Sequence, residues 1–285
     1  MLKALYWRIN LNIKKIKSKS LRKKLGKNVR AIITESQNGL FAVDPEDLEV
    51  GKKILSGGFA IEEINRLKSY IDSNSRILIV GSHIGSVAIP LSNYCKSVTA
   101  IEANPKTFEL LMINIELNNV NNIKSHNVFA NDKKEKVEFL LNTVNSGGSK
   151  RKPKNSNFLY EYDNPKSIQL DSVVLDEYLE DNKFDLVLID IEGSEYFAMK
   201  GMQKILSGCN TLVVEFLPHH LENVAGVSVE QFFSVIPKHF EKLHLPDNDQ
   251  THNFSESLDV LQNLYDSNSG EDGIIFTTKQ EITIK

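Results

Sequence analysis

The sequence predicts an α/β fold in which a mostly parallel sheet has helices on both faces. Apolar, β-rich runs alternate with helical patterns from residue 60 onward, and this alternation is typical of βαβ units. A glycine-containing turn follows the first of these runs, at the sheet edge where parallel sheets bind ligands. The 285 residues, of which 41% are apolar, suffice for one large domain with an extension.

The first 30 residues predict a basic amphipathic helix, because they contain 11 Lys or Arg residues and no Asp or Glu. The apolar residues of this segment recur at spacings of three and four: Leu2, Leu5, Ile9, Ile13 and Ile16. A helix of this type rests on an anionic membrane surface, which would be a peripheral membrane contact through residues 1–30. The same pattern fits a solvated arm, or a helix that docks on its own domain or on a second subunit.

The rest of the chain is acidic, with 23 basic and 37 acidic residues. The chain thus has a basic N-terminal segment and an acidic remainder, with no overall positive charge. No nucleic-acid partner is therefore expected. No apolar run reaches the ~18–20 residues that a membrane span needs, and no signal-peptide pattern is present. Cys95 and Cys209 show no metal-ligand spacing, which favours a reducing cytoplasm, with membrane association as a further option.

Residues 31–50 predict a β-hairpin, because Asn38-Gly39 separates two β-prone runs. A helix is predicted at 60–71. We therefore divide the chain into an extension of residues 1–57 and a domain of residues 58–285. Within the domain, strands are expected at 77–81, 97–102, 125–130, 185–191 and 211–216, and helices at 85–94, 106–118, 195–206 and 228–239.

Between residues 131 and 180 the alternation lapses. The run VEFLLNTV predicts one more strand, and the polar segment NSGGSKRKPKNSN that follows predicts a long loop. The basic residues of this loop suit a phosphate or an acidic glycan, or else are solvated: Lys150, Arg151, Lys152 and Lys154.

The turn GSHIGS at residues 81–86 follows the predicted strand 77–81. Glycines let the backbone approach a ligand, and the N-terminus of the following helix favours negative charge. His83 stands where the dinucleotide motif Gly-x-Gly-x-x-Gly has its second glycine, which disfavours a nicotinamide oxidoreductase. Glu102 ends the next strand, 21 residues after Gly81, and a carboxylate at this spacing accepts both hydroxyls of a ribose, unless it is a solvated loop residue.

The segment DLVLIDIEGSE at 185–195 predicts a buried strand that delivers acids to its C-terminal end. Alternation along a strand puts Asp190 and Glu192 on one side if the strand extends that far. Crowded carboxylates need a partner, which is a cation, a metal ion or a substrate hydroxyl that requires a base. Glu195 also fits the first turn of a helix, where the helix dipole stabilises its charge.

Glu215 ends a further apolar strand, and two histidines follow Pro218. His219 and His220 are candidates for a general base because histidine titrates near neutral pH, although such histidines are also common structural residues. Oxygen ligands are available from Asp190, Glu192 and Glu215, but no strict ligand spacing is present and no metal is predicted.

With these motifs in order, the chain resembles the FkbM family of S-adenosylmethionine-dependent methyltransferases. The resemblance runs from about Asn38 to about Phe216, and its most specific part is the Asp-x-Glu-Gly-x-Glu block in FDLVLIDIEGSEYFAMKGM. Further matching segments are GLFAVDPEDLEV, VGSHIGS, AIEANPKTFELLMINIELNN and LVVEF. The resemblance implies a Rossmann-like class I methyltransferase fold with a seven-stranded sheet, S-adenosylmethionine as cofactor, and O-methylation of a sugar, a glycan or another small hydroxylated metabolite.

The resemblance also implies roles for individual residues. Glu102 would hold the ribose, Asn131 or Asp132 would lie near the adenine, and Asp190 would sit between cofactor and acceptor. Asp132 also fits a plain turn residue. The methionine end of the cofactor would lie against the residues of the glycine turn: Gly81, Ser82, His83 and Gly85.

For catalysis we expect Asp190 or Glu192 to orient the acceptor hydroxyl, and His219 or His220 to act as the base.

Three positions depart from the family pattern. Ile79 stands where the family usually has an acid, His83 where it usually has Asn, and Leu188 where it usually has Lys. The change at Ile79 removes a charge near the cofactor's ammonium group. A catalytically degenerate binding or scaffold protein with the same fold is therefore the alternative.

Overall fold

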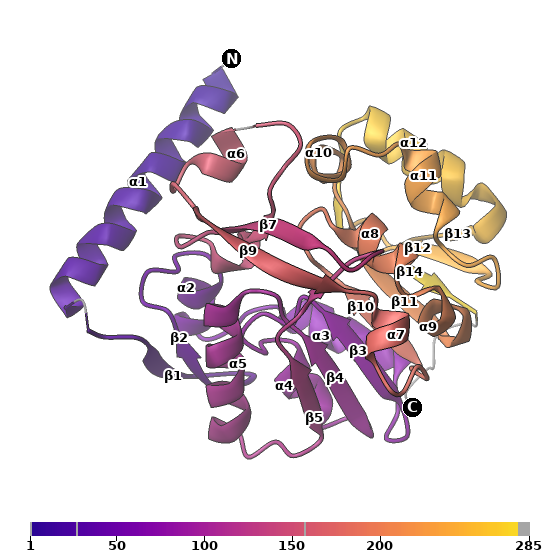
Figure 1. The fold of residues 1–285 in the computed structure, drawn as a ribbon, viewed down its shortest axis with the longest axis horizontal. Helices are drawn as coiled ribbons and strands as arrows, with labels where there is room; N and C mark the ends of the chain where they lie inside the picture. Colours follow the sequence, from indigo (N-terminus) through magenta and orange to yellow (C-terminus); the bar gives the residue numbers. More distant parts are fainter. Residues whose placement is uncertain (1, 27, 157, 279–285) are drawn as a thin grey trace.

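The computed structural model describes residues 2–26, 28–156 and 158–278. An eight-stranded sheet crosses the molecule, and helices cover both of its faces (Figure 1). The strand order is β13-β12-β14-β11-β10-β3-β4-β5, and β14 runs antiparallel to its neighbours. The predicted Rossmann-like class I architecture is confirmed, with β13 as an additional strand at one edge.

Five strands of this sheet are parallel. They are β3 (Arg76–Val80), β4 (Ser97–Ile101), β5 (Ile123–His126), β10 (Leu186–Ile189) and β11 (Thr211–Phe216). Four of them coincide with an apolar run that predicts a strand, and β5 overlaps the strand predicted at 125–130 only at residues 125 and 126. The sequence predicts none of the remaining three, which are β12 (Lys242–Leu245), β13 (Gln250–Asn253) and β14 (Glu271–Thr277).

One face of the sheet is covered by α3 (Ile61–Leu67), α4 (Ala88–Ser92) and α5 (Pro105–Leu117). The other face is covered by α7 (Leu175–Tyr178), α8 (Glu195–Lys200), α9 (Gln203–Gly208), α11 (Val229–Ser234) and α12 (Ser257–Asp266). In β3, Ile77 and Ile79 pack on the first face and Leu78 and Val80 on the second, because successive side chains of a strand point to opposite sides.

Four predicted helices are shorter or divided in the structure: the one predicted at 60–71 is α3 followed by a 3₁₀ turn, and the one predicted at 85–94 is only α4. The helix predicted at 195–206 is α8 followed by α9, and the chain turns at Gly201 between them. An added Cβ at Gly201 would lie 2.0 Å from the backbone oxygen of Asn131, so two segments meet there backbone to backbone. The helix predicted at 228–239 ends at Ser234, shortly before Pro237, because the residue before a proline disfavours helical geometry.

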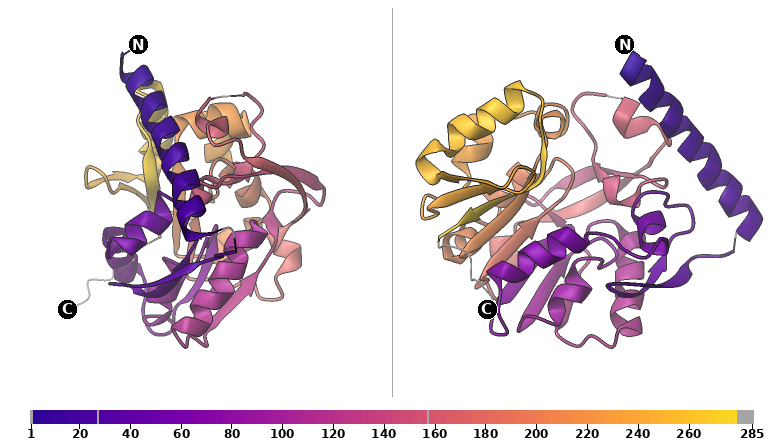
Figure 2. Two further views of the ribbon diagram at one scale, coloured as in Figure 1. Left: turned by 90° about the vertical axis from the view of Figure 1, so that its left-hand side faces the viewer. Right: turned by 180° about the vertical axis from the view of Figure 1, so that it is seen from behind.

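The N-terminal region forms α1 (Leu2–Leu25), the strands β1 (Ile32–Ser36) and β2 (Gly39–Val43), and α2 (Val50–Leu55). The predicted hairpin is confirmed, because β1 and β2 pair antiparallel around Asn38. Asn114 of α5 exchanges two hydrogen bonds with the backbone of Ala42 and so attaches the hairpin to the domain. Helix α1 lies along the outside of the molecule (Figures 1 and 2). No helix in the described part of the chain has the length and apolarity to cross a membrane.

A smaller sheet lies across one end of the large one (Figure 1). Its order is β6-β9-β7-β8, with β6 (Phe129–Ala130), β7 (Lys136–Leu141), β8 (Lys150–Arg151) and β9 (Lys166–Val173). The strand predicted at 137–144 corresponds to β7. The single strand predicted at 125–130 is wrong: β5 ends at His126, and the Asn127 amide donates to the Glu102 carbonyl, after which the chain enters the smaller sheet. Of the expected long loop, Lys150 and Arg151 form β8 of this sheet.

Candidate active site

A cavity lies at the C-terminal ends of β3, β4 and β10, which is where parallel sheets bind ligands. It encloses about 1120 Å³, open solvent at its mouth included. The structure brings six of the predicted site residues to its wall: Gly81, Ser82, His83, Glu102, Asp190 and Glu192. Segment 145–149, between β7 and β8, forms another part of the wall.

The glycine turn is fixed by backbone contacts. The φ angle of Gly81 is +95°, a conformation that favours glycine, and an added Cβ would lie 1.7 Å from the backbone oxygen of Asp190. The N–H groups of Gly81 and Ser82 both donate to the Ile101 carbonyl, at 2.9 and 3.0 Å. Gly85 lies behind the turn against the core, so it shapes the turn without lining the cavity.

His83 connects the turn to two other parts of the chain. Its φ of +49° is unusual for a residue with a side chain, and its N–H donates to the Glu102 carboxylate at 2.8 Å. The ring Nε2 lies 2.7 Å from the Ser146 hydroxyl, which in turn donates to the Asp47 carboxylate. Burial lowers the pKa of His83, and this favours a neutral ring.

Glu102 presents a fixed carboxylate at the end of β4. It is 7% exposed and lines the cavity. Its oxygens accept hydrogen bonds from the N–H groups of His83 and Asn104 and from the Thr107 hydroxyl, at 2.7–2.9 Å. Because each carboxylate oxygen has two lone pairs, acceptor capacity for the hydroxyls of a ligand is left.

Asn131 and Asp132 lie outside the cavity, which differs from their expected place near an adenine. Asn131 is fully buried; its amide donates to the Lys133 carbonyl and its oxygen accepts from Arg151. Asp132 pairs with Lys200 at 2.9 Å. Asn131 thus bonds within the smaller sheet and its connections, and Asp132 joins this region to α8. The cavity wall near this point is formed instead by Ala103, Val128, Phe129 and Ala130.

Asp190 directly follows β10 and its side chain is exposed to the cavity. The surrounding protein, followed by the charges of Glu215 and Glu192, raises the pKa of Asp190 well above its usual range. No side chain among the described residues hydrogen-bonds to this carboxylate. It is therefore a carboxyl group that is available to a ligand and that holds a proton more readily than an ordinary aspartate.

A turn places Glu192 in the site, whereas the sequence predicts that the alternation of a strand does so. Strand β10 ends at Ile189, and the backbone of Glu192 is left-handed with φ of +57°. The Glu195 carboxylate accepts hydrogen bonds from the N–H groups of Ile191 and Gly193, both at 3.0 Å, and so holds this turn. The alternation argument is therefore wrong, and the turn, not a strand, directs Glu192 into the cavity.

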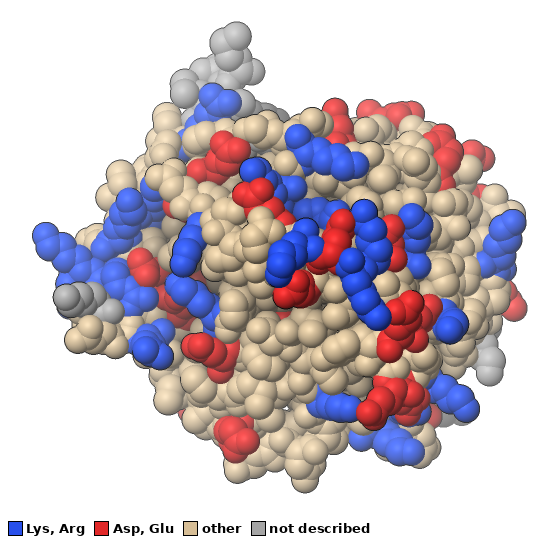
Figure 3. All heavy atoms as spheres, in the orientation of Figure 1, with Lys and Arg blue, Asp and Glu red and all other residues tan. Residues whose placement is uncertain are grey.

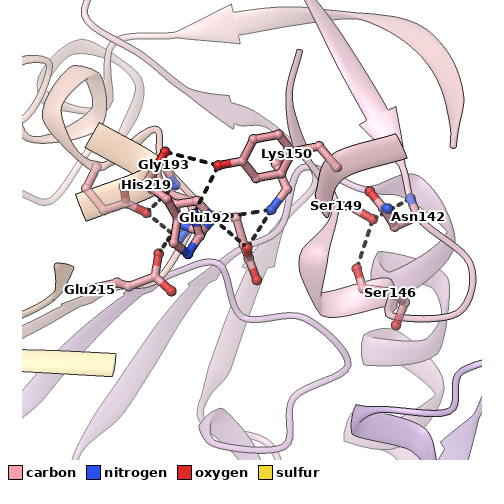
Figure 4. A network of polar contacts seen from close by, with 12 residues as sticks. Asn142, Ser146, Ser149, Lys150, Glu192, Gly193, Glu215 and His219 are labelled. Carbon is pink, nitrogen blue, oxygen red and sulfur yellow. Dashed lines mark hydrogen bonds and ion pairs between the residues drawn. The ribbon is translucent and has the colours of Figure 1, made fainter. Parts of the chain in front are cut away.

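Glu192 belongs to a buried network of four charged or titratable side chains (Figure 4). Lys150 Nζ donates to Glu192 Oε2 at 2.6 Å, and His220 Nε2 lies 3.3 Å from the same oxygen. On its other side, His220 Nδ1 shares a hydrogen bond of 2.9 Å with Glu215. Figure 4 shows Lys150 and Glu215 approaching Glu192 from opposite sides.

The proton distribution in this network follows from burial and from Lys150. Burial raises the pKa of Glu215 well above its usual range, and the charge of Glu192 raises it further. Burial, with a contribution from Lys150, lowers the pKa of His220 to about 4. Burial also opposes the ionisation of Glu192, but Lys150 and the neighbouring histidines together outweigh it and leave the pKa of Glu192 below its usual range. At neutral pH the ion pair is thus Lys150–Glu192, with a neutral His220 beside it.

His219 lies beside this network without joining it through its ring nitrogens. Its Nδ1 is 3.0 Å from the hydroxyl of Tyr160 in α6 (Phe158–Glu161), and its ring packs edge-on against His220. Burial lowers the pKa of His219 to about 4. Of the two predicted histidines, only His220 contacts Glu192 and Glu215.

Lys150 and Tyr160 also belong to this region, although the sequence indicates Lys150 only as one of four basic loop residues and gives no signal for Tyr160. The sequence places Lys150 in a polar loop, but its side chain is 6% exposed. Its ammonium also lies 5.0 Å from the centre of the Tyr160 ring. Both residues are far from Glu192 in the sequence, so the sequence does not show that they meet it. The pairing of β8 with β7 brings Lys150 to the site. No local signal distinguishes Lys150 from its solvated neighbours.

The two apolar departures from the family pattern are neighbours in the sheet. Ile79 of β3 and Leu188 of β10 are register partners, and both line the cavity. An acid and a lysine at these positions would form a cross-strand ion pair, so the two changes remove opposite charges together. Glu63 of α3 also lines the cavity, and burial raises its pKa. The site therefore keeps a carboxyl group near the position where the acid at 79 is missing.

Glu192, Glu215 and His220 place potential metal-ligand atoms within 4.8 Å of one another. This set differs from the oxygen set considered from the sequence, because His220 takes the place of Asp190. The Lys150 ammonium lies 2.6 Å from Glu192 and 3.5 Å from His220 Nε2, so a positive charge is already present in the cluster.

The methyltransferase FkbM domain model matches residues 80–261. No curated protein sequence matches the chain. Among solved structures, the tRNA m1G37 methyltransferase of M. jannaschii is 16% identical, with 67% of this chain and 45% of that chain covered and a TM-score of 0.37. TYW2 of M. jannaschii in complex with AdoMet is 15% identical (87% and 85% covered, TM-score 0.41). An rRNA methylase from Streptococcus thermophilus is 11% identical (77% and 95% covered, TM-score 0.43). Likenesses this low carry no conclusion about an acceptor.

Proposed function

Because the chain belongs to the FkbM methyltransferase family, we propose that it methylates a hydroxyl oxygen of a sugar, a glycan or another small hydroxylated metabolite. Family membership makes the protein a methyltransferase with S-adenosylmethionine as cofactor. The acceptor class and the roles of the residues are the proposal. The observation that carries it is Asp190, a carboxyl group with a raised pKa and no side-chain partner among the described residues, in the same cavity as Glu102.

The cavity residues fit this cofactor chemically. Glu102 offers a carboxylate to ribose hydroxyls, and Ala103, Val128 and Phe129 offer an apolar wall to an adenine. Glu63 and Asp190 offer carboxyl groups to the positive charges of the methionine portion. When bound, S-adenosylmethionine supplies a methyl group whose bond to sulfur breaks with the electron pair left on sulfur.

The chain's own task is to place the acceptor oxygen and take its proton. We assign the base to Asp190, because its carboxyl group faces the cavity and its raised pKa makes it a stronger base than an ordinary aspartate. A cation bound in the cavity would favour the ionised form of Asp190, which is the form that accepts the proton of the acceptor hydroxyl. Glu192, held by Lys150, would accept a hydrogen bond from the same or a neighbouring hydroxyl.

An acceptor screen with methyl-labelled cofactor tests this function. Sugars, cell-envelope glycans, small hydroxylated metabolites and RNA form separate arms, and mass spectrometry locates the label on oxygen or nitrogen. Label on the oxygen of a glycan or small metabolite is expected. Label on RNA, or only on nitrogen, would contradict the proposal.

Ile79 and Leu188 are the observations that favour the alternative, a scaffold protein that has lost the chemistry. Calorimetry with S-adenosylmethionine and S-adenosylhomocysteine separates the two. Binding of both is expected for the enzyme, whereas binding of neither would support the scaffold.

A further inference from the structure

Helix α1 exposes the apolar stripe that the sequence predicts. Four of its residues face solvent although they are large and apolar: Tyr6 is 68% exposed, Ile9 49%, Ile13 42% and Ile16 67%. At 3.6 residues per turn, these positions lie on one side of the helix and extend over about 15 Å along its axis. A helix that packs on its own domain normally turns such a stripe inward.

The opposite side of α1 faces the domain and is mainly polar. Arg22 donates to Glu46 at 2.7 Å, Lys14 donates to Glu49, and the Ser18 hydroxyl donates to the Glu46 carbonyl at 2.8 Å. Leu11 is the buried apolar contact of this side, at 8% exposed. Ion pairs and hydrogen bonds thus orient α1 so that its stripe points away from the protein.

Lysines border the exposed stripe. On the helical wheel Lys17 and Lys24 lie along one side of it and Lys19 and Lys23 along the other, and all four are exposed. Helix α1 has no acidic residue. In Figure 3 basic side chains gather along the left edge of the molecule, where α1 runs in Figure 1.

We propose that α1 is an interfacial helix that binds the surface of an anionic phospholipid membrane through this stripe. The isoleucines would enter the acyl boundary, and the bordering lysines would contact anionic headgroups. A second copy of the chain is a poorer occupant, because two stripes in contact would bring their bordering lysines together. The apolar centre of the stripe also distinguishes this surface from one that binds nucleic acid.

Because α1 lies next to the cavity, membrane binding through α1 would fix where the membrane lies relative to the cavity. Leu11 packs with Val144, which immediately precedes the cavity residues Asn145 and Ser146. The guanidinium of Arg8 lies 5.1 Å from the centre of the Phe158 ring in α6, the helix that carries Tyr160. A membrane against α1 would therefore lie beside the segments that border the acceptor side of the cavity. If the proposed function holds, this favours an acceptor in or on the membrane.

The test is vesicle co-sedimentation of the full chain without cofactor, so that it does not depend on methyl transfer. We expect binding to phosphatidylglycerol-containing vesicles that weakens with salt, and little binding to phosphatidylcholine vesicles. The triple variant I9S/I13S/I16S removes only side chains that are already exposed and should keep the melting temperature. We expect its vesicle affinity to fall roughly 100-fold. The matched control I33S/M112S changes exposed apolar residues elsewhere and should bind like the wild type.

Light scattering on the same proteins tests the alternative that a second copy of the chain binds the stripe. Equal binding to both vesicle types, or a triple variant that binds like the wild type, would overturn the proposal. A dimer that the triple variant converts to a monomer, without vesicle binding by the wild type, would assign the stripe to a second copy instead. Loss of methyl transfer to a soluble acceptor in the triple variant is not expected, because these residues do not contact the cavity.

Discussion

The two ends of the cavity are built in different ways. At the glycine-turn end, residues close in sequence fix one another: His83, Asn104 and Thr107 all donate to Glu102. At the other end, Glu192 lines the cavity and contacts Lys150 and His220, and His220 contacts Glu215. These three partners lie outside the cavity wall and come from two other segments of the chain, one at residue 150 and one at 215–220. The first end depends on local geometry, and the second depends on the whole fold. Substitutions at the two ends should therefore fail differently, in affinity at one and in turnover or stability at the other.

The largest effect is expected from Asp190→Asn. Removal of the proposed base should lower kcat by roughly 10²–10⁴. Cofactor affinity should fall much less, because Glu63 and Glu102 still line the cavity. In the wild type, kcat/KM should rise with pH through the raised pKa of Asp190, because the base must be ionised. Steady-state kinetics over a pH series with calorimetry of S-adenosylhomocysteine checks both points.

Asp132→Asn is the matched control, since Asp132 lies outside the cavity and pairs with Lys200. Its kcat should stay within about twofold of the wild type. An Asp190→Asn enzyme with unchanged turnover would remove Asp190 from the mechanism.

The next largest effect is expected on stability, from Lys150→Met. This change leaves the charge of Glu192 buried without its partner, which typically costs about 3–5 kcal/mol of unfolding free energy. Lys152→Met removes a more exposed ion pair with Glu138 and should cost less than about 1 kcal/mol. Urea denaturation measures both.

The double variant K150M/E192Q adds a further check, because it removes both charges. It should recover part of the stability that Lys150→Met loses. If Lys150→Met and Lys152→Met lower the unfolding free energy equally, Lys150 and Glu192 do not form a buried ion pair in solution.

A pH-dependent effect is expected from His220. Its pKa is lowered to about 4 by burial, with a further contribution from Lys150, against 6.5 for an ordinary histidine. Between these values the unfolded chain binds a proton that the native protein does not, so stability falls as the pH falls through this window. The largest contribution is about 3 kcal/mol. Carboxyl groups with raised pKa act in the opposite direction, so the measurement compares the wild type with His220→Asn. The variant should show the smaller loss on acidification, and identical slopes would contradict a buried neutral His220.

The smallest effect is expected from Glu102→Gln at the glycine-turn end. The amide is a weaker hydrogen-bond acceptor than the carboxylate, so cofactor affinity should fall by roughly 10–100-fold, while kcat at saturation changes little. Glu109→Gln on the exposed side of α5 should bind like the wild type in the same titrations. If Glu102→Gln lowers kcat but not cofactor affinity, the two ends of the cavity do not differ in the way proposed.

This division also explains what the sequence predicts and what it does not. The glycine turn, Glu102 and the acids after β10 are visible because a strand and the turn that follows it are adjacent in sequence. Lys150 is not visible, because a strand pairing 42 residues away from Glu192 brings it there. The resemblance implies that Asn131 or Asp132, at the end of the third predicted strand, lies near the adenine, but that strand divides at Asn127 and its second part joins another sheet.

Two further features of the structure cannot be predicted from residue spacing alone: the direction of the α1 stripe and the contact between positions 79 and 188. The spacing of Ile9, Ile13 and Ile16 predicts a stripe but not its direction, which the ion pairs of Arg22 and Lys14 with the 46–49 segment decide. The departures at Ile79 and Leu188 are seen as separate losses in the sequence. Only the strand register shows that they are adjacent and that their effects on charge cancel.

The contact between Gly81 and the backbone of Asp190 has an evolutionary consequence. It joins main chain to main chain with no room for a side chain, so the distance from the cofactor turn to the proposed base does not depend on the identity of neighbouring side chains. Segments 142–149 and 158–161, by contrast, are a connection and a short helix, the kinds of element in which sequence and length vary most between related proteins. A descendant of this protein could therefore change its acceptor by altering those segments and keep its methyl donor in the same place. In this fold, substrate choice and reaction chemistry can be inherited separately.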